Sequence, residues 1–181
     1  MTRPRHVVLV GLMGAGKTTV GVPLARALGR QYRDNDTELE QRTGRTAHDL
    51  AAAEGMEALH RAESDTLAAA LDGPGPDVIS ASASVVADAE MRARLRAAFV
   101  VWVDRNPDVL ADQFSGAGHR PDVGDDARAF FEAQYAARAP LYREVADYVL
   151  QPASGADLDA QVDAIASAVR RAETGSQEGR H

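Results

Sequence analysis

The sequence predicts an α/β fold with a mainly parallel sheet. Short apolar runs of the kind found in buried parallel strands alternate with longer helical segments along the chain. No internal repeat and no second set of such elements interrupts this alternation. The length of 181 residues fits one domain with a sizeable core, for which we take residues 1–172, followed by a polar tail at 173–181.

The first part of the chain is predicted to form a strand, a loop, a helix and a second strand. Residues 6–10 are an apolar run that ends at Gly11, which is typical of a buried strand. Residues 18–28 carry alanine and leucine, as helices do, and end before a glycine. A short strand at residues 31–33 then leads into an acidic segment at 34–36.

Glycine and proline residues divide the middle of the chain. We expect residues 37–71 to be mainly helical with breaks at Gly44 and Gly55, and the Gly-Pro-Gly-Pro segment at 73–76 to form a turn. Four apolar residues recur at helical spacing and are expected in the core: Met56, Leu59, Leu67 and Leu71. The next predicted elements are a strand at 77–80, a helix at 87–98 and a strand at 99–103.

The last part of the chain begins with a polar segment. Residues 112–126 are rich in glycine and aspartate, so we expect a mobile loop there. A helix at 127–145, a short strand at 148–150 and an amphipathic helix at 157–171 follow. Trp102 lies within an apolar strand and is expected in the core rather than against a ligand.

Composition excludes several classes of protein. Hydrophobic residues make up 45% of the chain, and no apolar stretch reaches the ~18–20 residues that a membrane helix needs. The N-terminus lacks the pattern of a secretory signal, so we expect a cytoplasmic protein. The absence of cysteine excludes disulfides, thiolate metal sites and thiol catalysis. A net charge of −7 disfavours nucleic-acid binding, and we expect a monomer that binds a small molecule.

The strongest motif follows the first strand. Residues 11–18 read Gly-Leu-Met-Gly-Ala-Gly-Lys-Thr, which matches G-x-x-x-x-G-K-S/T between a strand and a helix. Of the 20 basic residues only Lys17, in this motif, is a lysine. Lys17 can bridge the β- and γ-phosphates of a nucleotide, while Thr18 can offer its hydroxyl group to Mg²⁺. The motif predicts binding of a nucleoside triphosphate such as ATP through these residues: Gly11, Met13, Gly14, Ala15, Gly16, Lys17, Thr18 and Thr19.

Two carboxylates follow the second predicted strand. Alternation in an extended segment would point Asp34 and Asp36 to the same side. Beside a phosphate-binding loop, one of them can hold Mg²⁺, and the other can accept a hydroxyl proton or bind an acceptor. The alternative is a structural role, because Asp36 precedes a helical segment and would cap it well.

Four stretches in this order resemble the shikimate kinase family. They are GLMGAGKTTVGVPLARALG, YRDNDTELEQRTGRTAHDL, the RPD of the polar loop, and RAPLYREVADYV, and the resemblance covers roughly residues 6–150. It implies a three-layer P-loop kinase fold of the nucleoside monophosphate kinase type, with a five-stranded parallel sheet and a lid at about residues 112–126. It also implies Mg²⁺- and ATP-dependent phosphorylation of a hydroxyl group on shikimate.

The resemblance assigns roles residue by residue. Lys17 and Thr18 fall on the phosphate and Mg²⁺ positions, and Asp34 on the acidic residue near the metal ion. Asp36 falls on the aspartate that binds the shikimate hydroxyl groups and is a candidate base. Arg120 falls on the lid arginine that reaches the phosphates, and Arg138 on an arginine that grips the shikimate carboxylate.

Several positions depart from the family pattern. His60 stands where a second arginine shares the carboxylate, and Arg61, one position along the helix, points about 100° away. Ser82, Ala83 and Ser84 replace a Gly-Gly-Gly turn after the third strand, which narrows the pocket and adds hydroxyl groups. Gln113 takes the place of the adenine-side arginine, and Asp122-Val123 that of Leu-Leu.

These departures leave three readings of the function open. The first is an active small-molecule kinase with shikimate as the default acceptor. We expect its activity on shikimate to be weak or absent, because His60 is mostly neutral near pH 7 unless Glu63, one helical turn away, raises its pKa. The second is a kinase of the same fold that phosphorylates a different hydroxylated acceptor. The third is a nucleotide-binding protein with weak or lost phosphotransfer, which the presence of Lys17, Thr18, Asp34, Asp36 and Arg120 together disfavours.

Overall fold

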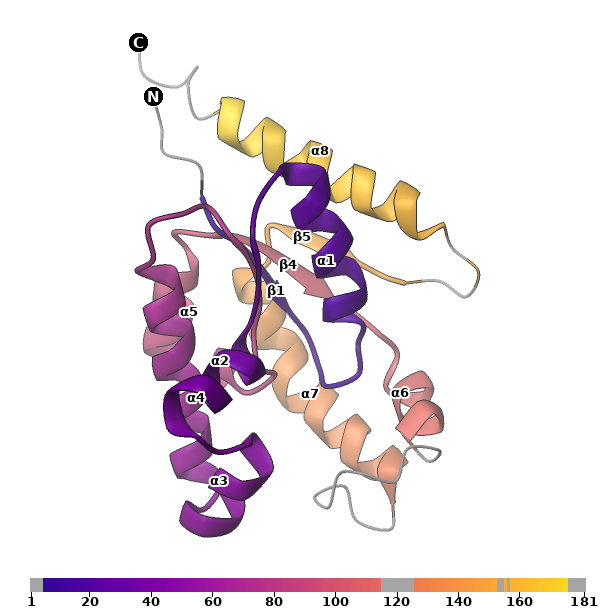
Figure 1. Ribbon diagram of the computed structural model, residues 1–181. Coiled ribbons are helices and arrows are strands. Elements are labelled where there is room, and N and C mark those ends of the chain that lie inside the picture. The colour runs from indigo at the N-terminus through magenta and orange to yellow at the C-terminus, as the bar shows by residue number, and fades with distance from the viewer. Residues whose placement is uncertain (1–4, 115–125, 153–154, 156, 176–181) are drawn as a thin grey trace.

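A computed structural model describes residues 5–114, 126–152, 155 and 157–175 of the chain (Figure 1). Within these residues, five strands form one parallel sheet in the order β2-β3-β1-β4-β5. The strands are β1 (Val7–Val10), β2 (Tyr32–Asp34), β3 (Val78–Ser80), β4 (Phe99–Val103) and β5 (Tyr148–Leu150). Each predicted strand is confirmed to within one residue at either end.

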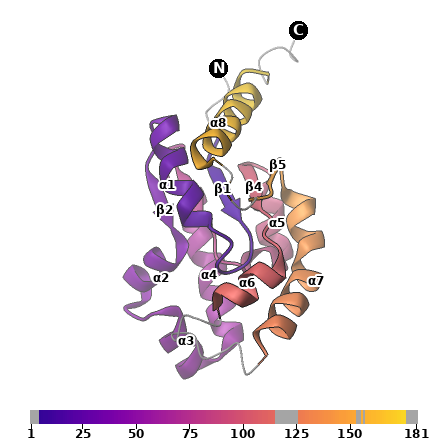
Figure 2. The ribbon, with the colours of Figure 1, turned by 90° about the vertical axis from the view of Figure 1, so that its right-hand side faces the viewer.

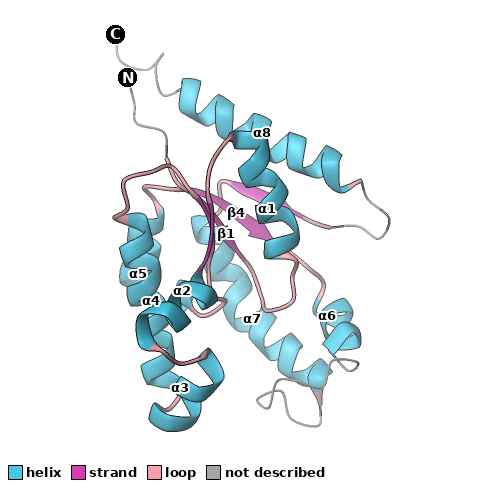
Figure 3. Ribbon diagram, viewed as in Figure 1, coloured by secondary structure: helices cyan, strands magenta, loops and turns pink. Residues whose placement is uncertain are grey.

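Residues of β1 alternate between the two faces of the sheet, because successive side chains of a strand point in opposite directions. Val7 and Leu9 pack against helices on one face, whereas Val8 and Val10 pack against helices on the other. The first face is covered by α1 (Lys17–Leu28) and α8 (Leu158–Gly175), and the second by α4 (Met56–Leu71), α5 (Ala89–Leu95) and α7 (Ala127–Val145). Figures 1 and 3 show the resulting three layers, which confirm the predicted α/β architecture.

Capping side chains and glycines divide the predicted helical region 37–71. Before α4 it contains α2 (Asn35–Thr43) and α3 (Ala47–Glu54). The Asp34 and Thr46 side chains cap the first turns of α2 and α3 by accepting hydrogen bonds from backbone amides. Gly44 and Gly55 have φ angles of 70° and 90° at the ends of these helices, so both predicted breaks are confirmed.

The structure corrects the prediction of a loop at 112–126. Residues 112–114 belong to a helix that the sequence analysis missed, α6 (Pro107–Phe114). Its start carries two ordinary signals, because Pro107 suits the first helical position and Asn106 Oδ1 accepts a hydrogen bond from the amide of Asp108 at 2.8 Å. Asp126 caps α7 through the amide of Ala129. Residues 115–125, which include Arg120 and Asp122-Val123, lie outside the described residues.

Three smaller expectations were also wrong. The helix predicted at 87–98 is only α5, because Ala87 belongs to a 3₁₀ turn, η1 (Val85–Ala87), and Asp88 caps the helix that follows. Helix α8 continues to Gly175, so the predicted polar tail begins as helix. Met56 is 48% exposed rather than in the core, although Leu59 and Leu67 are buried as expected. None of the helices in the described part of the chain is long and apolar enough to cross a membrane.

Trp102 of β4 confirms its predicted place in the core. It is 2% exposed, and its ring stacks on that of Tyr142 from α7 with 5.8 Å between the ring centroids. Tyr142 is buried as well, and its hydroxyl group donates a hydrogen bond of 2.8 Å to the carbonyl oxygen of Ala83. The core therefore reaches directly to the turn after β3, where the predicted acceptor pocket begins.

Candidate active site

The predicted site residues gather at the carboxyl edge of the sheet. Parallel strands all end at the same edge of the sheet. From β1 the chain continues to β2 and β3, which lie on one side of β1, and then crosses to β4 and β5 on the other side. Such a reversal opens a crevice in which open α/β sheets bind their ligands. Figure 2 shows α6 beyond the end of β1, with α7 beside it.

Glycine conformation shapes the loop between β1 and α1. Gly11, Gly14 and Gly16 have φ angles of 148°, 77° and 98°, which favour glycine over any residue with a side chain. A Cβ atom on Gly11 would lie 2.6 Å from the carbonyl oxygen of Val103, so the loop also needs glycine for its close approach to β4. The result is a loop whose backbone amides lead into the N-terminus of α1, as an anion site requires.

Lys17 is the first residue of α1, and its side chain folds back over the loop. Nζ donates hydrogen bonds to the carbonyl oxygens of Gly11 at 2.9 Å and Leu12 at 3.0 Å. These two backbone carbonyl oxygens hold the ammonium group over the loop. This is a position from which it can reach phosphate oxygens.

Tyr32 links the two predicted Mg²⁺ ligands, and the sequence analysis missed it. Its hydroxyl oxygen lies 3.3 Å from Thr18 Oγ1, 3.2 Å from Asp34 Oδ2 and 2.9 Å from Ser80 Oγ. Burial raises the pKa of Tyr32, so the hydroxyl group is neutral at pH 7. The available signal was its spacing, because Tyr32 and Asp34 lie two residues apart on one strand and face the same side.

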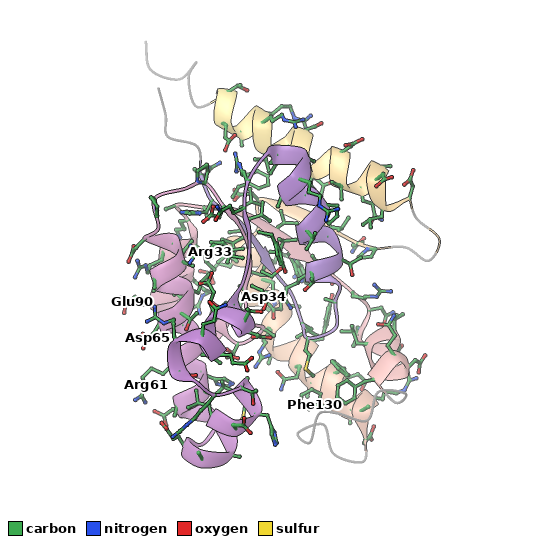
Figure 4. All side chains as sticks on the ribbon, viewed as in Figure 1. Arg33, Asp34, Arg61, Asp65, Glu90 and Phe130 are labelled. Carbon is green, nitrogen blue, oxygen red and sulfur yellow. The ribbon has the colours of Figure 1, made fainter. Side chains whose placement is uncertain are left out.

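The structure corrects the interpretation of the two carboxylates. Asp34 ends β2 and is itself the cap of α2, since Oδ1 accepts hydrogen bonds from the amides of Asp36 at 3.1 Å and Thr37 at 3.2 Å. Asp36 lies in the first turn of α2, so it is neither in an extended segment nor the helix cap. Figure 4 shows Asp34 near the middle of the molecule. Asp34 Oδ2 and Thr18 Oγ1 both lie near the Tyr32 hydroxyl group, whereas Asp36 contacts Ser82, so the two carboxylates face neighbouring parts of the same edge of the sheet.

Asp36 is joined to the turn after β3 by a chain of hydrogen bonds. The hydroxyl group of Ser82 donates to Oδ1 of Asp36 at 2.8 Å and accepts from Nδ2 of Asn35 at 2.9 Å. Nδ2 also donates to the carbonyl oxygen of Glu63 at 3.1 Å, and the Asn35 side chain is buried. Asn35 was not predicted, because a single asparagine between two aspartates gives no pattern in the sequence.

Charged side chains from α4 and α7 complete this side of the site. Burial raises the pKa of Glu63, although Ser84, which donates a hydrogen bond to its Oε2, and the charge of Arg138 both act to lower it. Burial and the charge of Arg138 lower the pKa of His60. The expectation that Glu63 raises the pKa of His60 is therefore wrong, and His60 is neutral at pH 7. Arg61 points away to solvent, as expected (Figure 4), and forms an ion pair with Glu57.

The predicted site residues fall into three groups. The structure brings together, at the loop and in the pocket beside it, the residues Gly11, Met13, Gly14, Ala15, Gly16, Lys17, Thr18, Asp34, Asp36, His60, Ser82, Ala83, Ser84 and Arg138. Thr19 and Gln113 are exposed on α1 and α6. Arg120 lies outside the described residues, so its role stays a prediction.

The residues present fit a nucleotide with a magnesium ion. Mg²⁺ is usually bound by one or two protein oxygen ligands together with phosphates and water, and Thr18 and Asp34 supply such oxygens beside the loop. Among the residues that the structure describes, no cluster of three or more histidine, aspartate or glutamate side chains is suited to hold a metal ion alone.

Comparison with known proteins identifies the family of this chain. Residues 13–170 match the sequence model of a family described as shikimate kinase. The shikimate kinase of Symbiobacterium thermophilum is 40% identical over 144 residues, which cover 78% of this chain and 83% of that protein. The shikimate kinase of Dechloromonas aromatica is 38% identical over 148 residues, which cover 81% and 80%. The structure of shikimate kinase from Acinetobacter baumannii in complex with shikimate is similar with a TM-score of 0.82 and 28% identity, over 98% of this chain and 96% of that one.

Proposed function

Because the chain belongs to the shikimate kinase family of ATP-dependent small-molecule kinases, we propose that it transfers the γ-phosphoryl group of ATP to a hydroxyl group of shikimate. One observation carries this proposal. The phosphate-binding loop and a group of side chains from Asp36, Ser82 and Arg138 lie at the same edge of the sheet. A nucleotide and a hydroxylated anion bound there would lie side by side.

Residues of the loop would bind the nucleotide. The amides of residues 11–18 face the phosphates, and Lys17 leaves its two backbone carbonyl partners to contact the β- and γ-phosphates. Thr18 and Asp34 would hold Mg²⁺, which when bound neutralises charge on the phosphates. The link from Tyr32 to both oxygens supports this assignment, because it holds them in position before the ion arrives.

Residues of the pocket would bind and orient the acceptor. The acceptor hydroxyl oxygen attacks the γ-phosphorus, the bond from phosphorus to the β–γ bridging oxygen breaks, ADP leaves, and the hydroxyl proton passes to Asp36. Oδ2 of Asp36 is the oxygen suited to receive that proton, because Ser82 occupies Oδ1. Arg138 supplies the positive charge that a carboxylate on the acceptor needs.

A coupled assay of ADP release tests the proposal. With ATP, Mg²⁺ and shikimate we expect ADP release that depends on shikimate and yields one phosphate ester per ADP, detected by ³¹P NMR. Asp36→Asn is the matched control, because it keeps the shape of the side chain but accepts no proton, and it should release little ADP. An enzyme that binds ATP but shows no shikimate-dependent turnover would contradict the assignment of the acceptor.

A second acceptor class is favoured by one observation. Neutral His60 and the hydroxyl groups of Ser82 and Ser84 make the pocket less cationic and more polar than two arginines and a glycine turn would. A hydroxylated acceptor other than shikimate, such as a cyclic polyol or another hydroxy acid, would suit a site that has one cation fewer. The same assay with a panel of such compounds decides between the acceptors through their kcat/KM values. The monomeric state and the cytoplasmic location stay predictions.

A further inference from the structure

We propose that Arg105 binds the nucleotide by contacting a phosphate group that ADP and ATP share. This inference rests on the proposed function, because it requires a nucleotide at the loop between β1 and α1. The sequence analysis gave Arg105 no role. Three observations support the proposal. They concern the position of Arg105, the lack of a carboxylate partner for it among the described residues, and its electrostatic surroundings.

Arg105 lies against the phosphate-binding loop. It comes two residues after β4, the strand that pairs with β1, and the carbonyl oxygen of Val103 is already close enough to exclude a side chain at Gly11. Its Nη1 atom lies 3.8 Å from the position that a Cβ atom on Gly16 would take. Gly16 is the residue that caps the N-terminus of α1. The guanidinium group therefore sits at the rim of the loop, beside the first amides of the helix.

No acidic side chain within the described residues pairs with this guanidinium group. Nε of Arg105 is buried without a hydrogen-bond partner. The adjacent carboxylate of Asp104 is engaged elsewhere, since Oδ1 accepts from the hydroxyl group of Tyr135 at 3.0 Å and Oδ2 from Nε2 of Gln151 at 3.1 Å. By contrast, the partly covered guanidinium group of Arg30 has a carboxylate partner, Glu173, at 2.6 Å.

The surroundings of Arg105 make an unpaired cation unfavourable. The N-terminus of a helix carries a partial positive charge, so a guanidinium group next to Gly16 is repelled by α1 as well as partly desolvated. An anion bound at the loop reverses both effects. A phosphate oxygen would accept from the guanidinium group while the helix dipole attracts the same charge. The arrangement thus costs stability without a ligand and strengthens the binding of one.

The position of Arg105 relative to Lys17 indicates which phosphates it contacts. Lys17 leans toward the start of the loop, at Gly11 and Leu12, whereas Arg105 lies beside its last residue, Gly16. Lysine of this motif serves the β- and γ-phosphates, and the loop amides hold the α- and β-phosphates. We therefore place Arg105 on the α- or β-phosphate, which stays on the ADP product. Gln113, which is exposed on α6, stands where the family has an arginine and carries no charge, and Arg105 would supply a cation for the nucleotide in its place.

Calorimetric titration of Arg105→Ala with ADP and with inorganic pyrophosphate tests the proposal. We expect both Kd values to rise by about 10-fold or more, since a charge-assisted hydrogen bond to phosphate is lost. Arg105→Lys keeps the charge but not the planar guanidinium group, so its Kd values should lie between those of the wild-type chain and those of Arg105→Ala. Arg26→Ala, which removes an exposed arginine from the far end of α1, is the matched control and should leave both Kd values unchanged.

Thermal unfolding separates this role from a structural one. Without ligand, Arg105→Ala should unfold at the same or a higher temperature than the wild-type chain, whereas the rise in Tm caused by ADP should be smaller. If Arg105→Ala bound ADP and pyrophosphate as tightly as the wild-type chain does, the role of Arg105 would be overturned but the proposed function would stand. A loss of affinity for ADP but not for pyrophosphate would also overturn it, because the contact would then be to the nucleoside. If the wild-type chain bound neither compound, the proposed function would fall as well.

Discussion

The hydroxyl group of Ser82 donates a hydrogen bond of 2.8 Å to Oδ1 of Asp36, and this bond joins the turn after β3 to the first turn of α2. Its direction is set by Asn35, whose Nδ2 atom donates to Ser82 and to the carbonyl oxygen of Glu63. Ser82 must therefore give its only proton to Asp36. The carboxylate is held with Oδ1 engaged and Oδ2 left to meet an acceptor.

Replacing Ser82 should weaken catalysis through Asp36. In Ser82→Ala the carboxylate loses its orienting donor, and we expect kcat to fall by about 5-fold, equivalent to a hydrogen bond of about 1 kcal/mol. Ser82→Thr keeps the hydroxyl group and should restore most of kcat. Steady-state kinetics with ATP and shikimate measure both variants, and the Kd for ADP serves as control because it should not change. An unchanged kcat in Ser82→Ala would show that Asp36 needs no orienting donor.

Lys17→Ala should abolish phosphotransfer without unfolding the protein. The ammonium group offsets charge that develops on the transferring phosphoryl group, and loss of such a contact costs about 100-fold or more in kcat. The two hydrogen bonds of Lys17 to the carbonyl oxygens of Gly11 and Leu12 end in a partly exposed region, so the fold should persist. Circular dichroism checks the fold and the coupled assay checks turnover. Wild-type turnover in this variant would refute the role given to the loop.

His60→Arg should strengthen the binding of an acceptor that carries a carboxylate. A second guanidinium group beside Arg138 adds a charged hydrogen bond, and we expect the KM for shikimate to fall by about 10- to 100-fold. His48→Arg on exposed α3 is the control for a new surface charge and should have no effect. A KM for shikimate that stays constant in His60→Arg would show that the acceptor carboxylate binds elsewhere.

The titration of His60 gives the same prediction a pH dependence. Burial and Arg138 lower its pKa below the ordinary value of 6.5, so the side chain is neutral at pH 7 and gains its proton only as the pH falls below that value. The added charge should lower the KM for shikimate as the pH decreases. Of the charged groups around it, Arg138 opposes protonation, and burial raises the pKa of Glu63. Kinetics with His60→Gln, which cannot take up a proton, should lose this dependence.

Much of the fold could be predicted because it depends on local pattern. The strands are continuous apolar runs, and the phosphate-binding loop is fixed by the spacing of its glycines and Lys17. Helix α6 was missed because its eight residues look like part of the polar segment that follows, although Pro107 begins it. Short amphipathic helices next to polar loops carry too few residues for their periodicity to stand out.

The parts of the site that were missed depend on contacts between distant segments. Tyr32 and Asn35 are unremarkable in sequence, and they matter because β2 lies next to β3 and brings them to Ser80 and Ser82. Spacing placed His60 and Glu63 on one helical face correctly. Spacing could not show that burial lowers the pKa of His60 and raises the pKa of Glu63, which favours the neutral form of both side chains. Burial is a property of the packed structure.

Glu63 should make the protein less stable as the pH rises. Burial raises its pKa in the folded state above the ordinary value of 4.5. At pH values between 4.5 and this raised pKa, the folded state binds more protons than the unfolded state does. The free energy of unfolding therefore falls as the pH increases through this window, relative to a variant without the carboxyl group. Glu63→Gln still accepts from Ser84 and should gain stability over wild type above pH 4.5. Urea unfolding of both proteins at several pH values measures the difference, and a constant difference would contradict the assignment.

Gly21→Ala should displace Tyr32 and destabilise the protein. A Cβ atom at Gly21 would lie 2.6 Å from Cε2 of the Tyr32 ring, and forcing a methyl group into such a contact costs about 1–3 kcal/mol. If the clash is with this ring, Gly21→Ala should cost much less in a Tyr32→Ala background, where the space is free. A double-mutant cycle by urea unfolding measures the coupling, for which about 1 kcal/mol or more is expected for residues in contact. Gly175→Ala at the end of α8 meets no atom within 4 Å and should be neutral. Additive effects of the two substitutions would mean that the contact with Gly21 does not position the Tyr32 ring. Some other contact would then have to hold the Tyr32 hydroxyl group near Thr18 and Asp34.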